Sequence, residues 1–295
     1  AVTVGLPDEP EIPSADVHLA MHATRSHLAI QQMASQQARV KTIVLLTGTD
    51  LYQDLPRGDE NCLRSMELAD VLVVTQESSL NSIPERWRAK GRVVSKSLGE
   101  PIPLSDGRPK DPGVFAVEMV FHGRATKDPF LILEALQQLS ELDRLRVTHC
   151  GSARGDGFGE QAADWLKRES RYRWLGEVSH AEALQRLLAA DLTVNTSVIE
   201  GGANSIVEAI SAGKPILATD IEPNIGQLGE GFPGLFPAGD AAVLARFLKR
   251  CCDDAAFLDD PDPKYIKAYG HFQDARIGLY LYAIDYERQF QELAT

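Results

Sequence analysis

The sequence predicts an α/β fold in which helices cover parallel sheets on both faces. Apolar runs of strand length alternate with segments of helical periodicity along the chain, which is typical of such sheets. One stretch rich in proline, glycine and charge, residues 98–113, interrupts the alternation and is predicted to be a linker. A chain of 295 residues with 44% hydrophobic and 24% charged residues has ordinary globular composition. We therefore expect two α/β domains.

The first domain is predicted over residues 1–105. Its strands are expected in four apolar runs, residues 16–22, 42–48, 71–76 and 92–97. Its helices are expected in the periodic segments between them, residues 26–38, 60–69 and 85–90. This order predicts one Rossmann-like unit with a parallel sheet.

The second domain is predicted over residues 106–266. Its strands are expected at residues 115–122, 145–151, 172–178, 191–197, 214–220 and 234–239. Its helices are expected at residues 128–142, 160–169, 179–190, 204–212 and 240–254. Residues 267–295 continue a helical pattern after this second Rossmann-like sheet is complete, so we expect a helix that returns to the first domain.

Charge and composition exclude several classes of function. The formal net charge is -12 and the 30 Lys and Arg residues are scattered, so a nucleic-acid backbone would meet net repulsion. The apolar runs are too short for a bilayer span and no basic-then-apolar leader opens the chain, so we expect a cytoplasmic protein without membrane insertion. The 4 cysteines lack C-x-x-C spacing, so we expect reduced thiols and no metal. The oligomeric state is not predicted.

The segment EGGANSIVE, residues 200–208, lies where a predicted strand gives way to a predicted helix. Ligands of open parallel sheets bind beyond the carboxyl ends of the strands, and two Rossmann-like units that face one another form a cleft there. Gly201 and Gly202 let a ligand approach the backbone closely. This segment is therefore a candidate binding site.

The start of the helix that follows is a candidate anion site. Free N–H groups and the positive end of the helix dipole are expected at Ala203, Asn204 and Ser205, which suits a diphosphate. A structural interpretation stays open, because Ser205 and Glu208 also have the spacing of a capping box. Gly213 is expected to end this helix.

A second anion-seeking feature is the segment FHGRATKDP, which follows the first strand of the second domain. Arg124 and Lys127 are expected to point into the same cleft as the glycine segment. A guanidinium beside an ammonium suits a diphosphate leaving group, whose negative charge grows as its bond to a sugar breaks. The alternative is that both are solvated surface cations.

Taken together, the segments RYRWLGE, ADLTVNTSVIEGGANSIVEAISAGKPILATD and RATKDP resemble the retaining glycosyltransferases of GT-B architecture. This large family includes bacterial enzymes of sucrose and glycogen synthesis, and its signature is the pair Glu200-x7-Glu208. The resemblance implies that Glu200 and the amides after it hold the donor sugar and that Glu208 binds the ribose hydroxyls. It further implies that Arg124 and Lys127 neutralise the diphosphate.

A narrower resemblance covers most of the chain. The segments TIVLLTGTDLY, HGRATKDPF, YRWLGE, EGGAN and ATDIEPNIGQLGEGFPGLFPAGD are similar to the selenosugar synthase family of selenoneine biosynthesis. In most of the wider family the arginine lies further from the lysine than Arg124 does from Lys127, which favours this branch. The resemblance implies a UDP-sugar donor, notably UDP-N-acetylglucosamine, and selenophosphate as the acceptor.

The acceptor side is expected to come from two strand ends of the first domain. His22 and Arg25 follow one strand, and Gly48, Thr49 and Asp50 follow the next. A small selenium oxyanion needs cationic or N–H donors, and Arg25 is the candidate. His22 could instead be a core histidine, and Asp50 could simply start the next turn.

Retention in this architecture is usually pictured as departure of the nucleoside diphosphate and attack by the acceptor on the same face. The catalytic candidates are then Arg124, Lys127, Glu200 and His22, which would act by positioning and charge, with no protein nucleophile, cofactor or metal.

The chain departs from the pattern at its start, since GT-B enzymes usually begin with a strand, a glycine-rich loop and a helix. We expect that this N-terminal unit is absent here. Three alternatives remain: a glycosyltransferase with a saccharide or lipid acceptor, an enzyme like the UDP-N-acetylglucosamine 2-epimerases, and a catalytically inactive regulatory protein.

Overall fold

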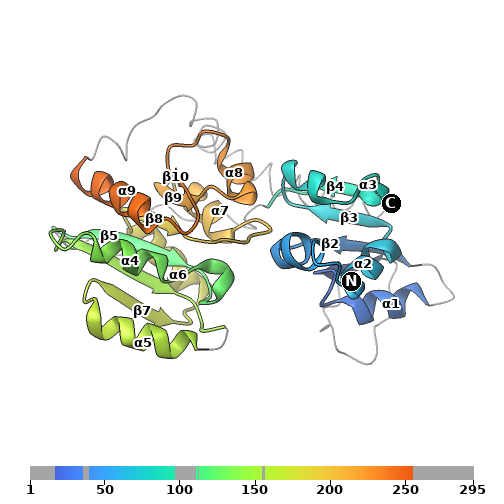
Figure 1. The fold of residues 1–295 in the computed structure, drawn as a ribbon, viewed down its shortest axis with the longest axis horizontal. Coiled ribbons are helices and arrows are strands. Elements are labelled where there is room, and N and C mark those ends of the chain that lie inside the picture. Colours follow the sequence, from blue (N-terminus) through green and yellow to red (C-terminus); the bar gives the residue numbers. More distant parts are fainter. Residues whose placement is uncertain (1–16, 36–39, 97–110, 112, 155–156, 255–295) are drawn as a thin grey trace. The chain divides into compact units, whose positions relative to one another are not determined.

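The computed structural model describes residues 17–35, 40–96, 111, 113–154 and 157–254 (Figure 1). The chain divides into two compact units. The first holds the described residues up to 96 together with Ile199–Gly202, and the second holds the other described residues. Each unit has its own parallel sheet, which confirms the predicted α/β class. The predicted domain boundary after residue 105 and the predicted helix at 267–295 lie outside the described residues.

The first unit is a 4-stranded sheet of order β1-β2-β3-β4 with every neighbouring pair parallel. Its strands are β1 Val17–Met21, β2 Lys41–Leu45, β3 Val71–Val74 and β4 Gly91–Val93. Its helices are α1 His27–Ala34, α2 Glu60–Leu68 and α3 Glu85–Arg88. Two further helical turns, η1 Asp50–Asp54 and η2 Ser78–Ser82, were not predicted, because each is too short to show a period.

Alternate residues of these strands contribute to different cores, as expected for a sheet buried on both faces. Val44 and Leu72 pack with Met66 of α2 and with residues of α1. Ile43 and Val73 belong to a separate cluster of buried residues. The near-continuous apolar character of the strands follows from this two-sided burial.

The second unit is a 6-stranded sheet of order β10-β9-β8-β5-β6-β7, again parallel throughout. Its strands are β5 Phe115–Val120, β6 Leu145–Cys150, β7 Tyr172–Gly176, β8 Leu192–Asn195, β9 Ile216–Thr219 and β10 Leu235–Phe236. Its helices are α4 Leu131–Gln137, α5 Phe158–Arg168, α6 His180–Ala189, α7 Asn204–Ser211, α8 Glu222–Leu228 and α9 Ala241–Asp253, with a short 3-10 turn, η3 Ala125–Lys127, after β5.

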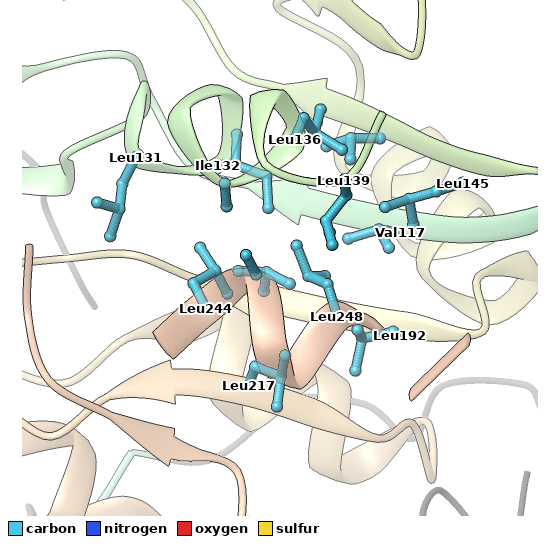
Figure 2. Close-up of a cluster of buried hydrophobic side chains, with 14 of the residues drawn as sticks. Val117, Leu131, Ile132, Leu136, Leu139, Leu145, Leu192, Leu217, Leu244 and Leu248 are labelled. Carbon is cyan, nitrogen blue, oxygen red and sulfur yellow. The ribbon is translucent and has the colours of Figure 1, made fainter. Parts of the chain in front are cut away.

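The largest core of this unit lies between the sheet and the pair α4 and α9. Figure 2 shows Ile132 of α4 and Leu139, just after this helix, facing Leu244 and Leu248 of α9. These side chains are all nearly inaccessible to solvent. Their packing holds α4 and α9 against the sheet.

The opposite face of β9 packs against other helices. Ile216 and Ala218 form a second cluster with residues of α6, α7 and α8, including Leu187 and Ile206. Helices therefore cover this sheet on both faces, as the sequence predicts.

Helix α8 is an element that the sequence analysis missed. Pro223 and Gly226 lie within it, and both residues normally argue against a helix. Pro223 is tolerated because it lies in the first turn, where its missing N–H would have no partner in the helix. No helix of the described residues is long and apolar enough to cross a membrane.

Candidate functional site

The strand order of the second unit creates a topological switch point at β5. The chain builds β5, β6 and β7 in one direction and then returns to place β8 on the other side of β5. In open α/β sheets such a point is where ligands bind, beyond the carboxyl ends of the strands. The segments that leave β5 and β8 there contain two of the predicted donor elements.

Hydrogen bonds to backbone carbonyls join these two segments directly. The Thr196 hydroxyl donates to the carbonyl oxygen of Lys127 at 2.8 Å. The N–H of Val198 donates to the carbonyl oxygen of Thr126 at 3.0 Å. The 3-10 turn η3 is closed by a 2.9 Å bond from the N–H of Lys127 to the carbonyl of Arg124. Asp128 then ends the turn in a left-handed conformation (φ 41), so α4 starts later than predicted.

The side chains of Arg124 and Lys127 are well placed to receive an anion. Lys127 is only 8% exposed. Arg124 is half-buried, and its Nε is buried with no hydrogen-bond partner among the described residues. A buried guanidinium N–H without an acceptor is costly, and a bound anion would supply that acceptor. This favours the binding interpretation over that of two solvated surface cations.

The end of β5 is held against the loop after β6 by residues without a predicted role. The N–H of Ser152 donates to Nδ1 of His122 at 3.2 Å, and burial lowers the pKa of His122. At Gly123 an added Cβ would lie 2.3 Å from the ring of Phe158, so only glycine fits there. These contacts fix the backbone just before Arg124.

Helix α7 begins at Asn204, and its N-cap residue is Ala203 in an extended conformation. No side chain caps this helix, and Ser205 is its second residue. The capping-box interpretation of Ser205 and Glu208 is therefore wrong. The prediction of a free N–H at Ala203 is also wrong, because this N–H donates to Oε1 of Gln227 at 2.8 Å. The first N–H groups of any α-helix have no carbonyl partner within the helix, so those of Ser205 and Ile206 are the candidates for an anion.

Glu208 lies one turn further along α7 and is 6% exposed. Nδ1 of the exposed His180, the first residue of α6, lies 3.8 Å from its Oε1. Glu200, Gly201 and Gly202 belong to the short segment grouped with the first unit. Of the predicted donor residues, Arg124 and Lys127 at η3 and Ala203 to Glu208 at the start of α7 all lie in the second unit.

A buried polar network supports the start of α7, and sequence reasoning missed it. Asn195 at the end of β8 accepts from the N–H of Ser197 at 3.1 Å and donates to Oγ of Ser205 at 3.3 Å. Asn224 of α8 donates to the carbonyl oxygen of Thr219 at 3.0 Å and to its hydroxyl at 2.9 Å. The sequence signal was a polar residue directly at the end of each apolar run.

In the first unit the structure brings His22 and Thr49 together at the ends of β1 and β2. Nε2 of His22 lies 2.8 Å from the Thr49 hydroxyl, and Nδ1 accepts the N–H of Arg25 at 3.3 Å. This contact at Nδ1 favours the neutral imidazole. Burial is the main cause of its lowered pKa, and its backbone has a positive φ of 75. The side chain of Arg25 is exposed, whereas Gly48 is buried.

Asp50 has the contacts of a structural residue. Its carboxylate is fully buried and accepts the N–H groups of Ala23 at 2.7 Å, Thr47 at 2.6 Å and Leu51 at 3.0 Å. These bonds tie the segment after β1 to the turn after β2, which favours the interpretation that Asp50 starts the next turn.

All four cysteines are buried free thiols, as predicted. Within the described ranges no group of three or more His, Cys, Asp or Glu side chains could hold a metal ion.

With this geometry in place, the chain can be compared with known proteins. Residues 109–270, more than half of the chain, match the family described as glycosyl transferases group 1. The chain belongs to this family. The match begins near the start of the second unit and contains Arg124, Lys127 and the whole segment 200–208.

Similar proteins agree with this family. A glycogen synthase of Mycobacterium tuberculosis is 34% identical over 40% of this chain, and the match spans only 30% of that relative's length. The solved structure of Anabaena HepE in complex with UDP-glucose covers 93% of this group 1 glycosyl transferase and 78% of HepE, at 18% identity and a TM-score of 0.72. The match to the solved structure of sucrose-phosphate synthase from Thermosynechococcus elongatus covers 94% of this chain and 73% of the synthase, at 19% identity and a TM-score of 0.70. At these identities the two structures show the shared fold.

Proposed function

We propose that this group 1 glycosyl transferase moves a sugar, N-acetylglucosamine in the first instance, from a UDP-sugar to the selenium of selenophosphate. The observation that supports the donor half is the hydrogen bond of Thr196 to the Lys127 carbonyl, which joins the segment of Arg124 and Lys127 to the segment that leads into α7, at the switch point of the second sheet. Support for a UDP-sugar comes from HepE, whose solved structure contains UDP-glucose.

On the donor side, Lys127 and Arg124 would neutralise the diphosphate, together with the first N–H groups of α7. Glu208 would accept hydrogen bonds from the ribose hydroxyls, and Glu200 with Gly201 would hold the sugar. These cations supply the positive charge that a metal ion supplies elsewhere, so we propose a reaction without a metal or other cofactor.

On the acceptor side, the first unit offers small and polar groups at the ends of β1 and β2. The exposed guanidinium of Arg25 would bind the selenophosphate anion. The neutral imidazole of His22, the hydroxyl of Thr49 and the backbone at Gly48 would line the same site.

In the proposed reaction the bond between the anomeric carbon and the diphosphate oxygen breaks, and a bond between that carbon and selenium forms on the same face. UDP leaves as the diphosphate anion. Water then cleaves the bond between phosphorus and selenium, which releases phosphate and the selenosugar. The enzyme would act by positioning and charge stabilisation.

A saccharide acceptor is the second candidate. It is favoured by the names of the similar proteins, which include a glycogen synthase and a sucrose-phosphate synthase. Such an acceptor would attack through a hydroxyl oxygen, and the donor half of the site would be unchanged.

The deciding experiment is incubation of the protein with selenophosphate and a panel of UDP-sugars, read by mass spectrometry. We expect a product that carries the selenium isotope pattern and one sugar, together with UDP. Glycosylation of glucose phosphates or glucans without any selenium product would overturn the acceptor assignment and leave the donor assignment intact.

A further inference from the structure

Gln227 of α8 holds both polar backbone groups of one residue at the candidate site. Its Oε1 accepts the N–H of Ala203 at 2.8 Å, and its Nε2 donates to the carbonyl oxygen of Ala203 at 3.1 Å. One side-chain amide thus pairs with an extended backbone as a neighbouring strand would. The contact lies within the second unit and joins two helices that are 24 residues apart along the chain at this point.

The paired residue is the one that sets where α7 begins. Ala203 is the N-cap of α7 and is 3% exposed. Two glycines precede it, and Gly202 has a φ of 129, so the chain before the helix has little intrinsic preference for one conformation. A bidentate contact at Ala203 removes this freedom at the last residue before α7 begins.

Helix α8 is itself held against the sheet, so the side chain of Gln227 starts from a fixed backbone. Asn224, one turn earlier, is fully buried and donates to Thr219 at the end of β9. The start of α7 is therefore tied to the sheet through α8 as well as through Asn195 and Ser205.

We infer that Gln227 is a positioning residue, which holds the start of α7 so that its first N–H groups meet the diphosphate of the donor. This inference rests on the proposed donor site. It assigns to Gln227 no contact with the substrate. A mutation should therefore weaken binding of the diphosphate more than binding of the nucleoside.

The test uses Gln227→Met, which keeps the length of the side chain and removes both hydrogen bonds. Calorimetry would measure the dissociation constants of UDP and of uridine, which lacks phosphate. We expect UDP affinity to fall about tenfold, as for the loss of one to two net hydrogen bonds, while uridine affinity changes less than twofold. The matched control is Gln138→Met at the exposed end of α4, where Gln138 contacts only its own helix at 3.4 Å. It should leave both constants unchanged.

Equal loss of UDP and uridine affinity, or unchanged UDP affinity, would overturn the positioning role. If Gln227→Met does not fold, Gln227→Glu serves instead, since it keeps the acceptor for the Ala203 N–H but turns an oxygen toward the Ala203 carbonyl. Failure of both variants to fold would make Gln227 a residue for stability alone, which also overturns the inference. A wild-type protein that binds no UDP would instead contradict the proposed function.

Discussion

Lys127 belongs to the proposed donor site and Arg25 to the proposed acceptor site, so variants of these two cations test the two sites separately. Lys127→Ala should weaken UDP binding at least tenfold, because a partly buried charge-assisted contact is worth about 1.5 to 3 kcal/mol. Arg25→Ala should instead raise the KM for selenophosphate at least tenfold and leave UDP binding nearly intact. Calorimetry with UDP and steady-state kinetics with selenophosphate measure the two effects.

Lys167→Ala is the control for this pair of variants. Lys167 is exposed on α5 and forms an ion pair with Asp164 on the surface at 3.1 Å, so its loss should change neither the Kd for UDP nor the KM for selenophosphate. A rise in both the Kd for UDP and the KM for selenophosphate, for Lys127→Ala and for Arg25→Ala alike, would indicate damage to the fold and would contradict the division of roles.

The role of the Glu208 carboxylate can be tested with Glu208→Gln, which removes the charge and nearly keeps the shape of the side chain. Glu208→Gln replaces a charge-assisted acceptor by a neutral amide, so UDP affinity should drop by roughly 1 to 3 kcal/mol. The Tm should hardly move, because the structure gives Glu208 no capping role at the start of α7. A clear loss of Tm at unchanged affinity for UDP would favour a purely structural residue.

His149 should make the stability of the second unit depend on pH. Its ring is fully buried, with Nδ1 2.8 Å from the Tyr172 hydroxyl and Nε2 2.8 Å from the carbonyl oxygen of Phe121. Burial lowers its pKa to about 4. At pH values between the ordinary pKa of histidine and this lowered pKa, His149 is protonated in the unfolded chain and neutral in the folded chain.

The free energy of unfolding should therefore fall as the pH is lowered from 7 toward 4. The full contribution of His149 is about 3 kcal/mol, from a shift of roughly 2.5 pKa units. Urea titrations at several pH values would measure it, and His149→Gln should reduce the slope. An equal slope in this variant would assign the pH dependence to other groups.

At the scale of elements, α7 ends as the sequence predicts. Gly213 has a φ of 61, its N–H bonds to the carbonyl of Ile210, and the N–H of Lys214 bonds to the carbonyl of Ala209, both at 2.9 Å. This is the Schellman pattern, and it requires the left-handed conformation at Gly213. The sequence predicts this helix end because the left-handed conformation depends on one residue type at one position.

Gly213→Ala should therefore destabilise the protein by about 1 to 2 kcal/mol through backbone strain alone, since an added Cβ meets nothing within 4 Å. The same substitution at Gly159, inside α5 and also in open space, should stabilise by about 0.5 to 1 kcal/mol. Chemical denaturation of both variants gives the comparison. A change of the same sign in the free energy of unfolding for both variants would contradict the role of the left-handed turn.

Helix α8 shows the opposite case at the same scale. Its sequence, with Pro223 and Gly226, gives no helical period, yet Asn224 and Gln227 of this helix make two of the contacts that fix the candidate site. Tertiary contacts outweigh the weak local preference here. Sequence patterns alone therefore find α7 and miss the helix that positions it.

At the scale of the whole molecule, UDP should stabilise the folded protein without any metal. Binding to the folded state alone adds about 2.7 kcal/mol when free UDP is 100 times its Kd. The Tm should thus rise with UDP concentration equally in chelator and in magnesium. Strict dependence of this rise on magnesium would contradict the proposal that Arg124 and Lys127 neutralise the diphosphate.

By itself the sequence determined the α/β class, the strands and most of the helices, and it supplied the two candidate donor segments. Each of these is encoded locally, in apolar period, in a glycine such as Gly213, or in cations next to a strand end. The acceptor candidates His22 and Thr49 were found in the same way.

Only the tertiary structure decided how these pieces meet. The order of strands places β8 beside β5, and this brings Thr196 against Lys127 although 69 residues separate them. It also showed that Asp50 is held by backbone N–H groups and that Gln227 pairs with Ala203. Such contacts depend on the packing of elements far apart in the chain, and no local pattern of residues encodes them.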